Sequence, residues 1–119
     1  MFRGIVTNVV DGDTVDVILD HGFRVTSEQR VRLLGVDTPE RGQKNYKEAT
    51  EFTTEKLLNK SVIIQTYKGD NFGRYLANIF YEENNETYNI SQELTNKDLI
   101  KPGSQWNTLK KESEWILWV

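Results

Sequence analysis

The chain contains no cysteine and a single histidine. The lack of cysteine excludes disulfides, thiolate metal sites and cysteine nucleophiles. No run approaches the roughly 18 apolar residues that a membrane-spanning helix needs, so we expect no integral membrane segment. The first residues also lack the basic start and long apolar stretch of a secretory signal. We therefore expect a protein that stays inside its cell or has lost a signal by cleavage.

A surplus of positive charge is missing as well. Fifteen Lys and Arg face 18 Asp and Glu, which gives a net charge of −3. Proteins that bind nucleic acid usually carry a basic surplus, so this balance argues mildly against such a partner. Four of the acids, however, fall in two short motifs, and setting them aside leaves 14 acids against 15 basic residues. Charge alone therefore does not exclude a nucleic acid; the four acids are Asp11, Asp13, Asp37 and Glu40.

Runs rich in Val, Ile and Leu, with partial period-two alternation, predict β-strands along much of the chain. Two turns that contain glycine, Asp11-Gly12 and Asp20 to Gly22, separate the first three of these runs. A polar stretch, Glu82 to Glu86, forms a turn before the last short run. The predicted strands are Ile5–Val10, Thr14–Leu19, Val31–Val36, Val62–Tyr67 and Tyr75–Tyr81, followed by a short strand at Thr87–Asn89.

Three segments predict helices. Gln43 to Lys60 is rich in Lys, Glu, Ala and Leu, and its apolar residues recur at intervals of three and four, as in an amphipathic helix. A shorter helix is expected over Gln92–Leu99, with Ser91 as its cap and Pro102-Gly103 after it. We expect a last helix over Asn107–Val119 that carries Trp115 and Trp118.

This order of elements predicts one α+β domain over residues 1–119. Hairpin-length connections between the first three strands make the sheet mainly antiparallel. A small sheet of this kind removes its free edges by curling into a barrel of the oligonucleotide-binding (OB-fold) type. We therefore expect a five-stranded OB-fold-like barrel with a long helix after the third strand and short C-terminal helices.

Acidic residues follow the ends of two neighbouring predicted strands. Asp11 and Asp13 lie in the first turn, and Asp37 and Glu40 follow the third strand. If the sheet curls, Asp11 and Asp37 face each other across one small cavity, where two carboxylates repel and favour a cation between them. The available ligands are hard oxygens, which select Ca²⁺ or Mg²⁺ over zinc or copper.

Each motif has a structural explanation when taken alone. Asp-Gly is a common hairpin turn, and the spacing after Asp11 does not fit an EF-hand. Thr38-Pro39-Glu40 has the composition of a helix start, and an arginine on a strand, such as Arg32, usually points to solvent. Their joint occurrence favours a functional site. Metal-binding carboxylates, a further carboxylate and two arginines, Arg32 and Arg74, meet the needs of phosphodiester hydrolysis.

Three segments of the chain resemble the signature motifs of the staphylococcal nuclease (thermonuclease) family, in order and with similar spacing. They are Asp11-Gly-Asp-Thr14, Arg32-Leu-Leu-Gly-Val-Asp-Thr-Pro-Glu40 and Asp70-Asn-Phe-Gly-Arg74, and the resemblance extends over about residues 4 to 100. It implies an oligonucleotide-binding barrel and a Ca²⁺-dependent nuclease that acts on DNA and RNA and leaves 3′-phosphate ends.

The resemblance also implies roles for single residues. Asp11 and Asp37 would be carboxylate ligands of Ca²⁺, the backbone carbonyl of Thr38 a third ligand, and Asp13 would lie in or just outside this ligand set. Glu40 would orient or deprotonate the attacking water. The two residues that would grip the scissile phosphate are Arg32 and Arg74.

The chain departs from the family in two places. Asn71-Phe72 stands where the family often has Lys-Tyr before the Gly-Arg pair, so these two become possible substrate-binding residues, with Phe72 able to stack on a base. After Leu99 the match fades, and Lys101 to Trp106 does not reproduce the family's tyrosine-containing substrate segment. If Arg32 and Arg74 face an open cleft, replacing either should leave stability unchanged.

Two other classes of function stay open. A non-catalytic nuclease-like module that binds RNA, DNA or protein typically lacks the acids or the arginines, and this chain keeps them. A structural calcium-binding module would leave Arg32 and Arg74 unexplained. We expect a monomer that acts on DNA and RNA. The Trp-rich end with Trp115 and Trp118 is more typical of a helix docked on the core than of a surface for a partner protein.

Overall fold

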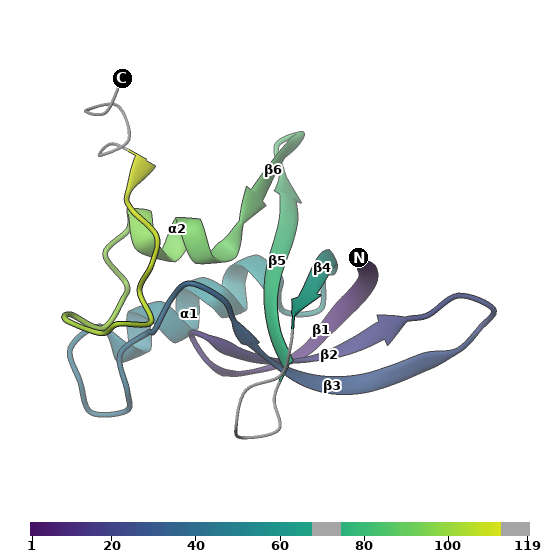
Figure 1. Cartoon of the computed structure of the whole chain (residues 1–119), viewed down its shortest axis with the longest axis horizontal. Helices are drawn as coiled ribbons and strands as arrows, with labels where there is room; N and C mark the ends of the chain where they lie inside the picture. The colour runs from purple at the N-terminus through teal and green to yellow at the C-terminus, as the bar shows by residue number, and fades with distance from the viewer. Residues whose placement is uncertain (68–74, 113–119) are drawn as a thin grey trace.

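The computed structural model describes residues 1–67 and 75–112, and within them β-strands alternate with two helices (Figure 1). The elements are β1 (Phe2–Asp11), β2 (Thr14–Asp20), β3 (Thr26–Leu33), α1 (Tyr46–Leu57), β4 (Ser61–Tyr67), β5 (Tyr75–Glu83), β6 (Glu86–Asn89) and α2 (Ile90–Asn96).

The strands form one sheet in the order β3-β2-β1-β4-β5-β6. Neighbours in this order pair antiparallel, and a parallel pairing of β3 with β5 joins the two sides of the sheet. This pairing sets Val31 opposite Tyr75 and Leu33 opposite Ala77. The first five strands therefore close into a barrel with β6 outside it, which confirms the predicted α+β, mainly antiparallel, OB-fold-like architecture.

The core fills the barrel and continues beneath the helices. Figure 1 shows α1 and α2 together on one side of the strands, away from the β2–β3 hairpin. α1 buries Ala49, Thr53 and Leu57, and α2 buries Ile90 and Leu94. No helix among the described residues has the length and apolar character to cross a membrane. The fully buried strand residues include Val6, Val15, Val31, Leu33, Ile64, Ala77 and Ile79.

The third strand lies earlier in the chain than the sequence predicts. We expected Val31–Val36, whereas β3 begins at Thr26 and ends at Leu33. Its polar first half pairs with β2 from Thr26 opposite Asp20 onward, so ladder hydrogen bonds rather than apolar content define the strand there. After Leu33 the chain turns at Gly35, whose φ of +85° is a left-handed conformation that favours glycine.

The long helix is shorter than predicted. α1 covers Tyr46–Leu57 instead of Gln43–Lys60. Asn45 adopts a left-handed φ of 69° directly before the helix, and Leu58 is already extended after it. The predicted apolar face is confirmed at Ala49, Thr53 and Leu57.

The C-terminal elements also differ from the prediction. α2 begins at Ile90, and its cap is Asn89, whose side chain accepts a hydrogen bond from the Ser91 N–H at 2.9 Å; Ser91 is therefore not the cap. Residues 107–111 are not helical, because this stretch contacts other parts of the fold: Thr108 N–H donates to the Gly35 carbonyl. The rest of the predicted last helix, with Trp115 and Trp118, lies outside the described residues.

Candidate active site

One cavity gathers both acidic motifs. It has a volume of about 490 Å³ and opens between the β1–β2 turn, the end of β3 and the loop that follows β3. The predicted site residues that lie within positions 1–67 thus all line this one cavity, although they come from three separate segments. The lining residues are Val10, Asp11, Asp13, Thr14, Arg32, Asp37, Thr38, Pro39, Glu40 and Arg41.

Gly12 allows the β1–β2 turn to lie close to α1 and to the loop of Thr38. A Cβ on Gly12 would lie 3.0 Å from the Ala49 Cβ and 3.1 Å from two side-chain atoms of Thr38. The Gly12 carbonyl also accepts a hydrogen bond of 2.7 Å from the buried Thr53 hydroxyl of α1. The turn that carries Asp11 and Asp13 is therefore packed between α1 and the loop of Thr38, which brings the two acidic motifs together.

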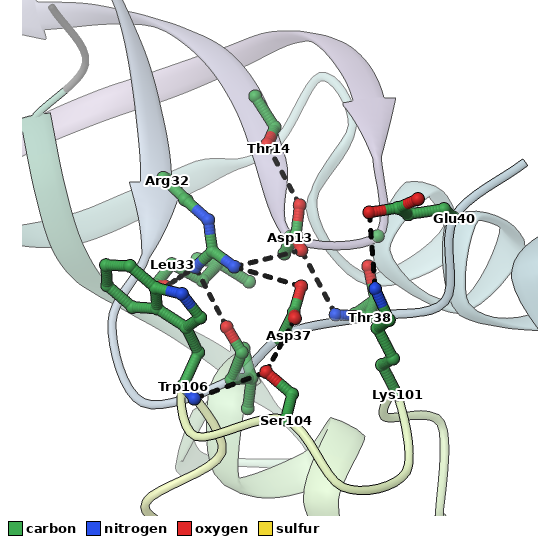
Figure 2. A network of polar contacts seen from close by, with 12 residues as sticks. Asp13, Thr14, Arg32, Leu33, Asp37, Thr38, Glu40, Lys101, Ser104 and Trp106 are labelled. Carbon is green, nitrogen blue, oxygen red and sulfur yellow. Dashed lines mark hydrogen bonds and ion pairs between the residues drawn. The ribbon is translucent and has the colours of Figure 1, made fainter. Parts of the chain in front are cut away.

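Arg32 lies at the centre of the polar network in Figure 2. Its side chain is only 8% exposed, so the expectation of an open cleft around it is wrong. Nη1 donates to the carbonyls of Leu33 and Val36, both at 2.9 Å. Nη2 donates to Asp37 Oδ1 at 3.2 Å and to Asp13 Oδ2 at 3.4 Å. The guanidinium is thus fixed by backbone on one side and shared between two carboxylates on the other.

Asp13 and Asp37 are the two acids that the structure brings together. The Asp13 carboxylate is nearly buried and also accepts from the Thr38 N–H at 3.0 Å and the Thr14 hydroxyl at 2.9 Å. Asp37 receives a hydrogen bond of 2.7 Å on its second carboxylate oxygen from Ser104. Because both carboxylates contact the same nitrogen of Arg32, they already share one positive charge.

Asp11 and Glu40 line the same cavity but stand apart from this pair. The Asp11 carboxylate accepts a hydrogen bond of 3.0 Å from the Tyr46 hydroxyl of α1. Glu40 has a side chain that is 72% exposed, and its only ion pair within the described residues is with Lys101 Nζ at 3.3 Å. An exposed carboxylate at the rim of a cavity is free to reach a water or a substrate, whereas Asp11 is restrained by α1.

The stretch 101–107, for which the sequence predicted no contact with the acidic motifs, completes the site. Residues 101–107 bind every polar group of Asp37: Lys101 N–H donates to its carbonyl at 2.6 Å, and the Asn107 side chain accepts from its N–H at 2.7 Å. Trp106 places its ring 5.1 Å from the Arg32 guanidinium, in a cation–π contact (Figure 2). No sequence signal could have found these contacts, because they join isolated residues of an irregular stretch to a loop about 70 positions earlier.

The residues present fit a hard divalent cation by the chemistry of their donors. Two carboxylates, those of Asp13 and Asp37, converge on one cationic nitrogen, and Thr38 Oγ1 is buried with no hydrogen-bond partner among the described atoms. Oxygen donors of this kind suit Ca²⁺ or Mg²⁺. In residues 1–67 and 75–112, however, no three acidic or histidine side chains form a ready-made metal cage. Protein atoms there would supply only part of a coordination shell.

Three predicted site residues lie outside the described part of the chain. They are Arg74 and the possible substrate-binding pair Asn71 and Phe72. The single histidine, His21, lies at the surface, where its ring contacts the Ser27 hydroxyl at 2.6 Å, away from the cavity.

Comparisons with known proteins point to one family. The family model described as staphylococcal nuclease homologue matches residues 30–115. The chain is 34% identical to a thermonuclease of Staphylococcus hyicus over 82% of its own length and 54% of that protein. It is 37% identical to an uncharacterised protein of Methanocaldococcus jannaschii over 78% of its length and 55% of that protein, and 32% identical to a micrococcal nuclease of Shigella flexneri over 66% and 42%.

The chain thus spans about half the length of the curated relatives that it matches. The matched region begins within β3 and contains Arg32, Asp37, Thr38 and Glu40 of the cavity. Together with the closed barrel and the gathered motifs, these similarities show that the chain belongs to the staphylococcal nuclease family.

Proposed function

We propose that the protein is a Ca²⁺-dependent nuclease that hydrolyses phosphodiester bonds of DNA and RNA. Membership of a nuclease family supports the reaction class. The observation that carries the proposal is the cavity in which Arg32, two converging carboxylates and the exposed Glu40 meet. A guanidinium beside carboxylates in one cavity is the donor set that phosphoryl chemistry requires.

Arg32 would bind the scissile phosphate. Its Nη1 is engaged by two backbone carbonyls, which fix the plane of the guanidinium, and its Nη2 donates to Asp37 and Asp13. To bind the phosphate, Nη2 would exchange a carboxylate for a phosphate oxygen, and Nε would supply a second donor. Such a donor binds more strongly as negative charge grows on these oxygens, so it stabilises the transition state more than the ground state. We propose that Arg74 supplies a second guanidinium.

Glu40 would act on the attacking water. Its carboxylate lines the cavity and is exposed, so it can accept a hydrogen bond and then a proton from a water placed there. The water oxygen would form a bond to phosphorus while Glu40 takes its proton, the bond to the 5′ oxygen would break, and this oxygen would take up a proton from solvent. The products would carry a 3′-phosphate and a 5′-hydroxyl.

Asp37, Asp13 and the Thr38 carbonyl would hold the cation, with Asp11 close by. Asp13 is favoured over Asp11 as the carboxylate partner of Asp37, since Asp13 shares a cationic nitrogen with Asp37 and Asp11 is bound to Tyr46. A bound Ca²⁺ would neutralise charge on a non-bridging phosphate oxygen. The hydrogen bonds from Thr38 N–H and Ser104 to the two carboxylates would fix the position of the cation.

Incubation of plasmid DNA and of RNA with Ca²⁺, with Mg²⁺ and with a chelator tests the proposal. We expect degradation with Ca²⁺, none with the chelator, and product ends that a 3′-phosphatase alters. Degradation that continues in chelator would overturn the metal dependence. No degradation with either cation, together with retained nucleic-acid binding, would favour a non-catalytic module of the same family.

A further inference from the structure

A second cavity lies directly beside the candidate active site. It has a volume of about 430 Å³, and Pro39 lines both cavities. Lys101 joins them as well, because it lines the second cavity while its Nζ contacts Glu40 of the first at 3.3 Å. The two spaces are therefore neighbours along one surface. The residues that line the second cavity are Pro39, Gln43, Lys44, Asn45, Asp98, Ile100, Lys101 and Pro102.

The charge of this second cavity is positive. It contains two lysines, Lys44 and Lys101, and one acid, Asp98. The Asp98 carboxylate is paired with Lys111 at 2.7 Å, which offsets its charge. Lys44 is exposed and forms no ion pair within residues 1–67 and 75–112. A lysine without an ion-pair partner in these residues thus lines a hollow next to the proposed site for a scissile phosphate.

Both lysines are carried by backbone that is tied to the loop of the active site. Gln43 precedes Lys44 and is bound twice to Glu40, through its N–H at 2.9 Å and its side-chain oxygen at 2.8 Å. Lys101 N–H donates to the Asp37 carbonyl at 2.6 Å, and its own carbonyl accepts from Asn107 at 2.7 Å. The second cavity is therefore held in a fixed relation to Asp37 and Glu40.

From these contacts we infer that the second cavity binds the backbone phosphate of a nucleotide that neighbours the scissile bond. Lys44 supplies the principal charge, and Lys101 moves between Glu40 and this phosphate on its flexible stem. The inference rests on the proposed nuclease function and adds to it a second phosphate contact, so that a single nucleotide fills only half of the binding surface.

Binding measured without cleavage tests this assignment. The probe is a fluorescent single-stranded oligothymidylate of about eight nucleotides, titrated in chelator at a series of salt concentrations, with thymidine 5′-phosphate as a competitor. We expect Lys44→Gln to weaken binding of the oligonucleotide by about threefold to fivefold at low salt. The slope of log affinity against log salt should fall by about 0.7, the value for one phosphate contact on a single strand. Competition by the mononucleotide should not change.

Lys60→Gln is the matched control. Lys60 is also exposed, but it follows the far end of α1 and donates to the Glu55 carbonyl at 2.7 Å. The same loss of charge there should leave the affinity and the salt slope as in the wild type. Equal weakening by both variants would overturn the assignment, because it would reflect overall charge alone.

The binding and cleavage measurements distinguish a failure of the second phosphate site from a failure of the proposed nuclease function. A Lys44→Gln variant with wild-type affinity and salt slope would overturn the second phosphate site, whether or not the protein cleaves DNA. A wild type that shows the Lys44-dependent binding but cuts neither DNA nor RNA would support the phosphate site and remove the nuclease function.

Discussion

Arg32 is the residue on which most contacts of the site converge. Backbone carbonyls, two carboxylates and the ring of Trp106 surround its guanidinium. A buried cation of this kind offsets part of the charge of Asp13 and Asp37 in the folded protein. In the proposed function, it would also donate to the scissile phosphate.

Replacing Arg32 by Lys should therefore lower both turnover and stability. We expect turnover to fall by about 10²–10³, because an ammonium cannot reproduce the paired donors of a guanidinium. The free energy of unfolding should fall by about 1–3 kcal/mol, since two backbone carbonyls lose their donor. Steady-state rates and urea denaturation measure the two effects.

The comparison variant is Arg74→Lys, for which we predict the same loss of turnover. Near-native turnover in both variants would refute the proposal that Arg32 and Arg74 bind the scissile phosphate. An unchanged stability of Arg32→Lys would contradict the contacts that the structure gives to this side chain.

Glu40→Gln should lower turnover by about 10²–10⁴, because the amide cannot take a proton from water. Its exposure and its position outside the Asp13–Asp37 pair predict little change in Ca²⁺ affinity. Calorimetric titration with Ca²⁺, run beside the kinetic assay, separates the two roles. A variant that kept its rate and lost the cation would identify Glu40 as a ligand instead of a base.

At the scale of single residues, the sequence predicted a shared cavity but not which side chains meet in it. Asp11 and Asp37 were expected to face each other across one cavity, and both line it, but the acid that shares Arg32 with Asp37 is Asp13, whereas Asp11 is bound to Tyr46. The burial of Arg32 was not predictable, because it depends on Trp106 and on the backbone carbonyl of Val36, which lies beyond the end of β3. Spacing along a chain carries no information on such contacts.

At the scale of elements, the stretch 101–107 holds the loop of Asp37 in place by hydrogen bonds, and we call this stretch the strap. Asn107 alone links Asp37 N–H to the Lys101 carbonyl, at 2.7 Å each. The helix predicted from Asn107 onward was wrong for residues 107–111, because side chains and backbone groups of this stretch are used in long-range contacts. Local composition predicts a helix wherever Leu, Lys and Glu gather, and it is overridden when tertiary contacts give the backbone other partners.

Asn107→Ala should loosen this strap. It leaves the Asp37 N–H without its partner and removes the shorter of the two hydrogen bonds to the Lys101 carbonyl, which keeps the Ser104 N–H at 3.4 Å. We therefore expect a loss of about 1–3 kcal/mol in the free energy of unfolding. Turnover should fall as well, because Asp37 is no longer fixed relative to Arg32. Asn78→Ala is a suitable control, since Asn78 lies on β5 and its side chain is paired only with the exposed Tyr67 hydroxyl, at 3.5 Å. Equal effects of the two variants would contradict a specific role for Asn107.

The β2–β3 hairpin carries a pH-dependent contact away from the site. Asp16 lies opposite Arg30 in the ladder, and Arg30 Nε donates to its carboxylate at 2.8 Å. The hydrogen bond from Arg30 lowers the pKa of Asp16 below its ordinary value of 3.8, and burial opposes this shift. Because the pKa is lower in the folded state than in the unfolded state, the contact stabilises the fold above the unfolded pKa and is lost as the pH falls through the folded one.

Asp16→Asn should therefore be slightly less stable than the wild type near neutral pH, and the difference should disappear in strong acid. The effect is small because the Arg30 side chain is 54% exposed and the ion pair is screened by water. Urea denaturation of both proteins across the acid range measures it. A difference that grew as the pH fell would contradict the direction of the pKa shift.

For the molecule as a whole, the barrel was predictable, but the pair of strands that closes it was not. Alternating apolar runs and hairpin-length turns gave the strands and their antiparallel order, since these features depend on neighbouring residues. The parallel pairing of β3 with β5 joins segments more than 40 positions apart, and no local pattern encodes it. The shift of β3 toward Thr26 has the same origin, because pairing with β2 rather than hydrophobicity sets its bounds.

A cation that binds the folded chain should stabilise the whole molecule. We expect millimolar Ca²⁺ to raise the Tm, with a gain of about 2.7 kcal/mol when the free ion is a hundredfold above its Kd. Asp37→Asn should abolish the rise, because it removes one of the two converging carboxylates. Thermal melts with Ca²⁺ and with chelator provide the measurement. A Tm that ignored Ca²⁺ in the wild type would count against a site that exists before the substrate arrives.

The strap formed by residues 101–107 also has a consequence for the order of events during protein synthesis. The acids and Arg32 leave the ribosome early, whereas the residues that bind every polar group of Asp37 leave some 65 positions later. β3, which carries Arg32, likewise waits for β5 before its second neighbour is present. A nascent chain therefore exposes its acidic motifs without a finished site. The positions of Asp37 and Arg32 described above can therefore form only after β5 and residues 101–107 have been synthesised.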